Sequence, residues 1–354
     1  MENSKWPHAI LHLDMDAFYV NVHILDHPED AAIPLVVGGQ PDKRGVVASA
    51  SYSARQLGIR SAMPTKTAVR LCPTLKIVPV NWDRVHEKSR QVMEILRRFG
   101  AVEQMSVDEA YVDLSENDTP EETAVSIQNC VKEETHLPCS VGLATSKLVA
   151  KVASDHDKPE GCTIIHPKTE AAFLAPLSTR VIWGIGPKTA EKLAKQQITT
   201  CGQIASANLN ILRKAVGNQA EELQQRAQGI DGRSVKADRG LAKSISQEWT
   251  FNTDVDDPRI LTEHLQKMSK KIAKSLQKRE LVAHTVTVKF RWADFTTYTR
   301  QRSLDMGIDS GEEIYKVAHA IWDEHWPRDK KLRLIGVGVS KIEKPEVRQL
   351  GFNF

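Results

Sequence analysis

Apolar and polar side chains alternate near the start of the chain, a pattern typical of a half-buried strand. Residues 8–14, HAILHLD, carry this pattern and end at a carboxylate, so we expect a strand that ends at Asp14. Helical periodicity follows at 81–100, and then two short strands joined by a tight acidic turn. The region is expected to be completed by a helix around 121–135, a strand at 138–144, a helix at 146–155 and a strand near 162–166.

These elements follow the order βαββαβ when residues 18–80 are left out, which is the split βαβ or ferredoxin-like arrangement. We therefore expect 18–80 to form a small inserted domain. From Pro176 the pattern changes to short helices and glycine turns, through about residue 235. The polar stretch 236–243 that follows is expected to be a linker.

A second βαββαβ order is expected beyond this linker, without a residue-level repeat of the first. Its elements would be a strand at 243–251, a helix at 258–279, strands at 282–292 and 299–305, a helix at 310–325 and a strand at 332–341. Strand 282–292 has one apolar face, made of Val286, Val288, Phe290 and Trp292. Its other face would offer donors and cations to a polar partner through Thr285, Thr287, Lys289 and Arg291.

Composition indicates a folded protein of about two to four domains. Hydrophobic residues make up 41% and charged residues 26% of the 354 positions, close to globular averages. The sequence has no apolar run of roughly eighteen residues and no signal-like start, so we expect a soluble, cytoplasmic protein without a membrane partner. The five cysteines include no C-x-x-C pair, which argues against a disulfide framework and a cysteine zinc site.

Charge is distributed unevenly along the chain, although the net charge is only +3. From residue 230 onward there are 23 Lys and Arg against 18 Asp and Glu, a balance of +5. The preceding part has 25 against 27, a balance of −2. A basic C-terminal part would suit a phosphate-binding module, and ordinary charge scatter is the alternative.

Two acidic motifs stand where strands are expected to end or turn: Asp14-Met15-Asp16 and Ser106-Val107-Asp108-Glu109. Like charges in a partly buried site cost free energy unless a cation neutralises them. A few oxygen ligands with open positions suit Mg²⁺ and a phosphate-bearing substrate. Each motif alone could be a solvated surface pair. The βαββαβ order, however, places the first strand's end beside the central turn.

Five motifs in order then carry a family resemblance: DMDAFYVNV, GVVASASYSARQLGIRSAMP, SVDEAYVDL, GLATSKLVAKVASDHDKPEG and GIGPKTAEKL. They closely resemble the Y-family DNA polymerases, in the DNA polymerase IV (DinB-like) branch, from about residue 8 to 342. The resemblance implies an α+β right-hand polymerase for translesion, low-fidelity and distributive synthesis without a proofreading exonuclease. It also implies a palm (1–17 and 81–173), fingers (18–80), a helical thumb (174–237), a linker (238–242), a βαββαβ little finger (243–342) and a flexible tail (343–354).

By the same resemblance, Asp14, Asp108 and Glu109 are the catalytic carboxylates, and with the Met15 carbonyl they would hold two Mg²⁺ ions, with Mn²⁺ as a possible substitute. Tyr19 falls on the steric-gate position that excludes a ribose 2′-OH, and Phe18 beside it would also contact the nucleotide. The deoxynucleoside triphosphate (dNTP) would be met by Tyr52, Arg55 and Lys158, with Ser49 and Ser106 as hydroxyl contacts. Without the motifs, Tyr19 would be a core aromatic, the cations surface residues and the serines structural.

Primer–template DNA and a sliding clamp are the expected macromolecular partners of a monomer. Gly184, Gly186 and Lys188 lie in a stretch that resembles a helix-hairpin-helix, which aims backbone N–H groups at a DNA phosphate. Lys289 and Arg291 would add cations from the little finger. The tail resembles clamp-binding peptides through Gln349, Leu350, Phe352 and Phe354, and a frayed end is the alternative.

The chain departs from the family pattern on the first fingers helix, where His23 replaces a usual Glu and Val20-Asn21 replace Ala-Ser. We expect altered packing there and unchanged chemistry. Two other functions stay open from the residues alone. A catalytically inert DNA-binding or adaptor paralogue would share the fold, and a nucleotidyl cyclase would share the paired carboxylates.

Overall fold

The computed structural model describes residues 6–238, 240–326 and 330–345. The chain forms two compact units, 1–238 and 239–354, so the division falls at the start of the expected linker 238–242. None of the helices in the described ranges is both long and apolar enough to cross a membrane. The five cysteines are free thiols, as expected.

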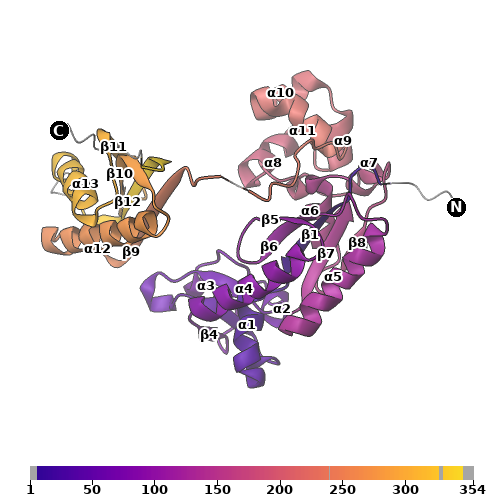
Figure 1. The fold of residues 1–354 in the computed structure, drawn as a ribbon, viewed down its shortest axis with the longest axis horizontal. Helices are drawn as coiled ribbons and strands as arrows, with labels where there is room; N and C mark the ends of the chain where they lie inside the picture. The colour runs from indigo at the N-terminus through magenta and orange to yellow at the C-terminus, as the bar shows by residue number, and fades with distance from the viewer. Residues whose placement is uncertain (1–5, 239, 327–329, 346–354) are drawn as a thin grey trace, which may run out of the picture. The chain divides into compact units, whose positions relative to one another are not determined.

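A five-stranded sheet forms the centre of the first unit, in the order β5-β6-β1-β7-β8 (Figure 1). Its strands are β1 (Ile10–Met15), β5 (Ala101–Gln104), β6 (Glu109–Asp113), β7 (Cys139–Ala144) and β8 (Cys162–Ile164). Without β8, this is the strand order of the ferredoxin-like arrangement. The ferredoxin-like arrangement expected from the sequence is therefore confirmed.

Both faces of this sheet are covered, which explains why all six residues of β1 are buried. Leu11 and Leu13 pack with the helices α4 (Trp82–Arg97) and α5 (Pro120–Thr135) in one apolar cluster. On the other face, Ile10 packs with α6 (Lys147–His156). Because alternate side chains leave opposite faces of a strand, Asp14 shares the α6 face.

The inserted segment 18–80 forms a small three-stranded sheet of its own, in the order β3-β2-β4. Its strands are β2 (Leu35–Gly38), β3 (Val47–Ala50) and β4 (Lys76–Val78). Around them lie α1 (Phe18–Asp26), α2 (Tyr52–Gln56), α3 (Thr65–Leu71) and two 3₁₀ turns, η1 (Pro28–Asp30) and η2 (Pro41–Lys43).

Short helices follow the first sheet, and the last four gather in one cluster (Figure 1). They are α7 (Glu170–Leu174), α8 (Pro187–Ala194), α9 (Cys201–Ser206), α10 (Leu209–Val216) and α11 (Ala220–Ala227), with the 3₁₀ turns η3 (Thr179–Val181) and η4 (Gly217–Gln219). The glycine hairpin was expected between two helices. The element before it is the three-residue turn η3, and only the element after it, α8, is an α-helix.

The second unit has the expected βαββαβ order: β9 (Ser244–Val255), α12 (Pro258–Gln277), β10 (Val282–Trp292), β11 (Thr297–Ile308), α13 (Gly311–His325) and β12 (Leu332–Glu343). Its sheet order, β11-β10-β12-β9, differs from that of the first sheet. Here β10 and β12, the second and fourth strands of the motif, are central, and β9, the first strand, is at an edge. The two halves therefore share an element order and differ in topology.

Two details of this unit correct the sequence-based expectation. The apolar face of β10 is buried as predicted, but Thr285, assigned to the polar face, is also buried at 2% exposure. Its hydroxyl lies 3.4 Å from the Ser303 hydroxyl on β11. The pairing of β10 with β11 shifts register between Ala283 and Thr285. The last strand includes Glu343, which pairs with Val282, so the tail cannot begin at 343 as expected.

Candidate active site

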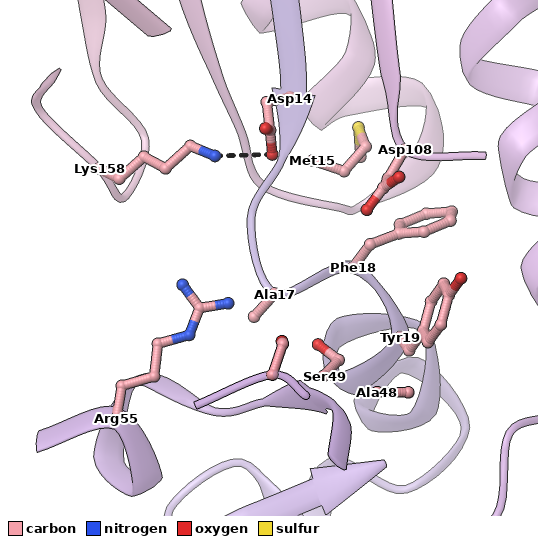
Figure 2. A pocket seen from close by; sticks show the side chains of 11 residues that line it. Asp14, Met15, Ala17, Phe18, Tyr19, Ala48, Ser49, Arg55, Asp108 and Lys158 are labelled. Carbon is pink, nitrogen blue, oxygen red and sulfur yellow. Dashed lines mark ion pairs between the residues drawn. The ribbon is translucent and has the colours of Figure 1, made fainter. Parts of the chain in front are cut away.

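Strand pairing brings the two acidic motifs together at one end of the first sheet. Asp14 on β1 lies opposite Glu109 on β6, and the Met15 amide donates to the Asp108 carbonyl at 3.0 Å. A cavity of about 150 Å³ opens there, and Figure 2 shows the side chains around it. Its lining includes Asp14, Asp108, Arg55 and Lys158, so carboxylates and cations from distant segments face one space.

Asp14 is the most strongly perturbed carboxyl of the site. Burial raises its pKa from 3.8 to about 7, against the attraction of Lys158, and the charges of Glu109 and Asp155 raise it further. The Lys158 Nζ lies 2.7 Å from Asp14 Oδ1 and 2.9 Å from Asp155 Oδ1. These two carboxylates raise the pKa of Lys158 in spite of its burial. The lysine is thus the cation that partly offsets the buried charge of Asp14.

Asp108 and Glu109 point to different places. The Ser106 hydroxyl donates to Asp108 Oδ1 at 2.5 Å and accepts from the amides of both acidic residues, which holds the turn between the strands. Asp108 lines the cavity with Asp14. Glu109 instead pairs with Lys151 at 2.8 Å and lines a neighbouring hollow that includes Trp183. Ser106 therefore acts here as a turn former, and it is not among the cavity-lining residues.

Helix α6 and the loop after it supply a lysine to each of three carboxylates on three strands. Besides the Lys158–Asp14 and Lys151–Glu109 pairs, the Lys147 Nζ lies 2.6 Å from Glu103 Oε2 on β5. Both side chains of this last pair are nearly buried, and the Lys147 ammonium also lies 4.7 Å from the centre of the Tyr111 ring. The sheet face under α6 is therefore neutralised pair by pair.

The donor types around the cavity fit a hard divalent cation. Asp14 and Asp108 offer carboxylate oxygens to one open space, and Asp14 is buried enough to favour a compensating cation. Among the described residues no three His, Cys, Asp or Glu side chains are gathered as a metal site. Asp14 contacts Lys158 instead, and Glu109 contacts Lys151.

Tyr19 lies at the edge of the cavity, on the first turn of α1 (Figure 2). Its ring centre is 5.9 Å from that of Phe18 and 5.8 Å from that of Trp82, which meets it edge-on at 69°. Burial and the nearby charge of Asp108 raise the pKa of the Tyr19 phenol, so it stays neutral at physiological pH. The gate residue predicted from the sequence is thus held by aromatic packing.

The remaining predicted nucleotide contacts divide into two groups. Ser49 and Arg55 line the cavity with Lys158, and the Arg55 Nε donates to the Ala50 carbonyl at 3.0 Å. Tyr52 does not line it: its hydroxyl donates to Asp16 Oδ1 at 3.0 Å. A phenol has one O–H to donate, so in this arrangement Tyr52 has none left for a triphosphate.

The departures on α1 make new contacts. His23 Nε2 lies 2.8 Å from Asp30 Oδ2, and Lys76 on β4 contacts the other oxygen of Asp30 at 2.7 Å. The side-chain amide of Asn21 donates to the Asp16 carbonyl at 2.5 Å, which supports the left-handed turn at Ala17 where α1 begins. That the packing there is altered relative to the family stays a prediction from the sequence.

The predicted DNA-binding residues are accessible in each unit. Gly184 has φ +99°, a conformation that favours glycine, and Gly186 precedes α8 with open space where a side chain would lie. Lys188 is exposed on the first turn of α8. In the second unit the Lys289 Nζ lies 2.7 Å from Glu248, and Arg291 donates to Thr297. The predicted clamp-binding residues lie outside the described residues.

Three residues that shape the site were not among the candidates: Asp16, Lys151 and Trp82. Asp16 belongs to the first acidic motif, but the family resemblance does not make it one of the metal ligands. Lys151 lies one helical turn after Lys147 in the sequence, and that spacing on a helix facing acidic strands was a usable signal. Trp82 opens the helix after the inserted segment, and nothing in the sequence relates it to Tyr19.

Comparison with known proteins identifies the family of this chain. The impB/mucB/samB family matches residues 13–155, and the impB/mucB/samB family C-terminal domain matches residues 242–352. DNA polymerase IV 2 of Agrobacterium fabrum is 38% identical over 94% of each chain. DNA polymerase IV of Dehalococcoides mccartyi is 39% identical over 95% of this chain and 88% of its own length.

This chain belongs to the Y family of DNA polymerases, in the DNA polymerase IV branch. It is a DNA-directed DNA polymerase of the translesion class. Solved structures support the same fold. A Y-family chimera of Dbh and Dpo4 matches with a TM-score of 0.86 and 28% identity, over 95% of this chain and all of that one. DinB from Sulfolobus solfataricus matches with a TM-score of 0.66, also at 28% identity and with the same coverage.

Proposed function

We propose that this polymerase extends a primer along a DNA template by nucleotidyl transfer from dNTPs, with two divalent ions at Asp14, Asp108, Glu109 and the Met15 carbonyl. The observation that carries the proposal is one cavity faced by two carboxylates, Asp14 and Asp108, two cations, Arg55 and Lys158, and the ring of Tyr19. The bound ions, Mg²⁺ in the first instance and Mn²⁺ as a substitute, would stabilise the attacking and leaving oxygens of an in-line displacement.

The chain's own side chains bind and select the nucleotide. Arg55 and Lys158 face the cavity from the side opposite Asp108 and would take the triphosphate, with Ser49 as a hydroxyl contact. Tyr19 would stand beside the sugar and exclude a 2′-OH. To contact an ion, Glu109 would have to leave Lys151 and Asp14 would have to leave Lys158.

We assign the parts of the fold accordingly. The five-stranded sheet is the palm, the three-stranded insert the fingers, the helix cluster the thumb and the second unit the little finger. Primer–template DNA is the proposed partner. A solved insertion ternary complex of Dbh DNA polymerase, similar to this chain at 27% identity and a TM-score of 0.68, supports a polymerase that works in complexes. Gly184, Gly186 and Lys188 would hold phosphates from the thumb, and Lys289 and Arg291 from the little finger.

Distributive, low-fidelity synthesis without proofreading is part of the same proposal, and it rests on the resemblance to the family. The cytoplasmic location and the monomeric state stay predictions from the sequence. The clamp contact is also proposed: deletion of residues 349–354 should abolish stimulation by a sliding clamp and leave synthesis on short primers unchanged. Full stimulation of the deleted protein would place the clamp contact elsewhere.

Primer extension tests the proposal, on an undamaged and on a lesion-bearing template. Asp108→Ala should lower extension by orders of magnitude without loss of folding. Asp118→Ala, an exposed carboxylate on the loop after β6, is the matched control and should extend normally. Wild-type protein that binds DNA without extending it would favour the inert paralogue, and cyclic nucleotide formation would favour a cyclase.

A further inference from the structure

Asp16 is a buried carboxylate just beyond the site, and it joins three segments of the first unit. Its side chain is 1% exposed and does not line the cavity. Three donors reach it: the Tyr52 hydroxyl at 3.0 Å, the Ser140 hydroxyl at 3.0 Å from each oxygen, and the Glu160 amide at 2.8 Å. A buried carboxylate is costly unless it is hydrogen-bonded, so these donors fix one another's positions through it.

One of these bonds holds the loop that presents Lys158. The Glu160 amide donates to Asp16 Oδ2, and the next amide, that of Gly161, donates to the Ser140 hydroxyl at 3.3 Å. Lys158 lies two residues before Glu160 in this loop and faces the cavity. The Lys158 backbone is therefore tied to the end of β1 by a charged hydrogen bond.

The hydrogen bond from Tyr52 to Asp16 holds the aromatic ring that the Arg55 guanidinium contacts. The Tyr52 hydroxyl is fixed by Asp16, and the Arg55 guanidinium lies 4.7 Å from the centre of the Tyr52 ring. A cation over an aromatic face is attracted to it, so the ring's orientation sets where the guanidinium rests. Arg55 lines the cavity although Tyr52 does not.

We propose that Asp16 is a positioning residue that sets both phosphate-binding cations, Arg55 through the Tyr52 ring and Lys158 through its loop, without touching the nucleotide. This inference rests on the proposed function, in which those two cations bind the triphosphate. Contacts to the triphosphate are made before the reaction as well as during it. Loss of Asp16 should therefore raise the KM for dNTP more than it lowers kcat.

The experiment compares Asp16→Asn with Asp30→Asn in steady-state primer extension and in thermal unfolding. Asp30 is a matched control because it is also buried in the first unit, at 3% exposure, and bonded to two partners, His23 and Lys76, away from the cavity lining. Both variants should lower the Tm. Asp16→Asn should raise the KM about tenfold or more, the effect of losing one or two charged hydrogen bonds, with kcat changed by less than about threefold. Asp30→Asn should leave the KM within about twofold.

Tyr52→Phe keeps the test open if Asp16→Asn fails to fold, because it removes one bond and leaves the carboxylate in place. It should raise the KM several-fold, and the Asp16→Asn/Tyr52→Phe double variant should be no worse than Asp16→Asn alone. An unchanged KM in Tyr52→Phe, additive effects, or an equal KM rise in Asp30→Asn would each overturn the inference. Wild-type protein that cannot extend a primer would instead defeat the proposed function.

Discussion

Replacement of Asp14 by Asn should stabilise the metal-free protein while removing its activity. Burial raises the Asp14 pKa from 3.8 to about 7, so ionisation of this carboxyl is less favourable in the folded than in the unfolded chain. The difference of 7 − 3.8, about 3 pKa units, corresponds to about 4 kcal/mol when the group is fully ionised. The side chain is only 12% exposed, so solvent screening reduces this figure little.

The pH dependence has a defined sign. Below pH 3.8 Asp14 is protonated in both states and has no effect. As the pH rises from 3.8 toward 7, Asp14 loses its proton in the unfolded chain and keeps it in the folded chain, so the free energy of unfolding falls. Above about pH 7 Asp14 is ionised in both states, and the free energy of unfolding falls no further. Asn is neutral throughout. Asp14→Asn should therefore match the wild type near pH 4 and exceed it by up to about 4 kcal/mol at pH 8.

Urea unfolding at pH 5, 6.5 and 8, with EDTA present, measures this difference. Lys158 keeps Asp155 as a partner in the variant, so no buried ammonium is left unpaired. Asp118→Asn, at an exposed carboxylate that does not act on the pKa of Asp14, is the control and should show no such pH trend. Added Mg²⁺ favours ionised Asp14 and should narrow the gap. A variant that is no more stable than the wild type at pH 8, or equally more stable at every pH, would refute the electrostatic argument.

Three further predictions concern the gate, the palm and the second unit. Tyr19→Ala should raise kcat/KM for ribonucleotides by orders of magnitude relative to deoxynucleotides, and an unmoved ratio would make Tyr19 a core aromatic only. Glu103→Gln should destabilise the protein by about 3 kcal/mol in urea unfolding, because it leaves the Lys147 ammonium buried without its anion; an exposed control, Glu116→Gln, should not. A chain that ends at residue 240 should lose most of its salt-sensitive affinity for primer–template DNA, and equal affinity would contradict a role for the little finger.

Elements with one buried face could be predicted closely from the sequence. The strand expected at 282–292 has the bounds of β10, and the helix expected at 258–279 is only two residues longer than α12. Buried positions recur with a regular period along a strand or a helix, and the spacing of apolar residues in the sequence shows that period. The sheet order of the second unit could not be predicted from the sequence, because the same βαββαβ order is compatible with more than one arrangement of strands.

The cavity residues could be predicted by family resemblance, while their contacts could not. Asp16 accepts from an amide 144 positions away, and Lys151 pairs with a carboxylate 42 positions away. Such contacts depend on which strand lies beside which helix, and local pattern carries no information about that. Tyr52 shows the consequence: it was expected to contact the nucleotide, but its hydroxyl is directed to Asp16.

The lysines that face the acidic motifs act as built-in counter-ions. Lys158 and Lys151 neutralise Asp14 and Glu109, so a divalent ion that enters must exchange with an ammonium group. The apparent affinity for the ion then depends on how much more strongly the carboxylates attract the ion than the lysines. An incoming triphosphate eases this exchange, because it offers Lys158 a new anion. We therefore expect the protein to take up its ions together with the nucleotide, and to hold them weakly when no nucleotide is bound.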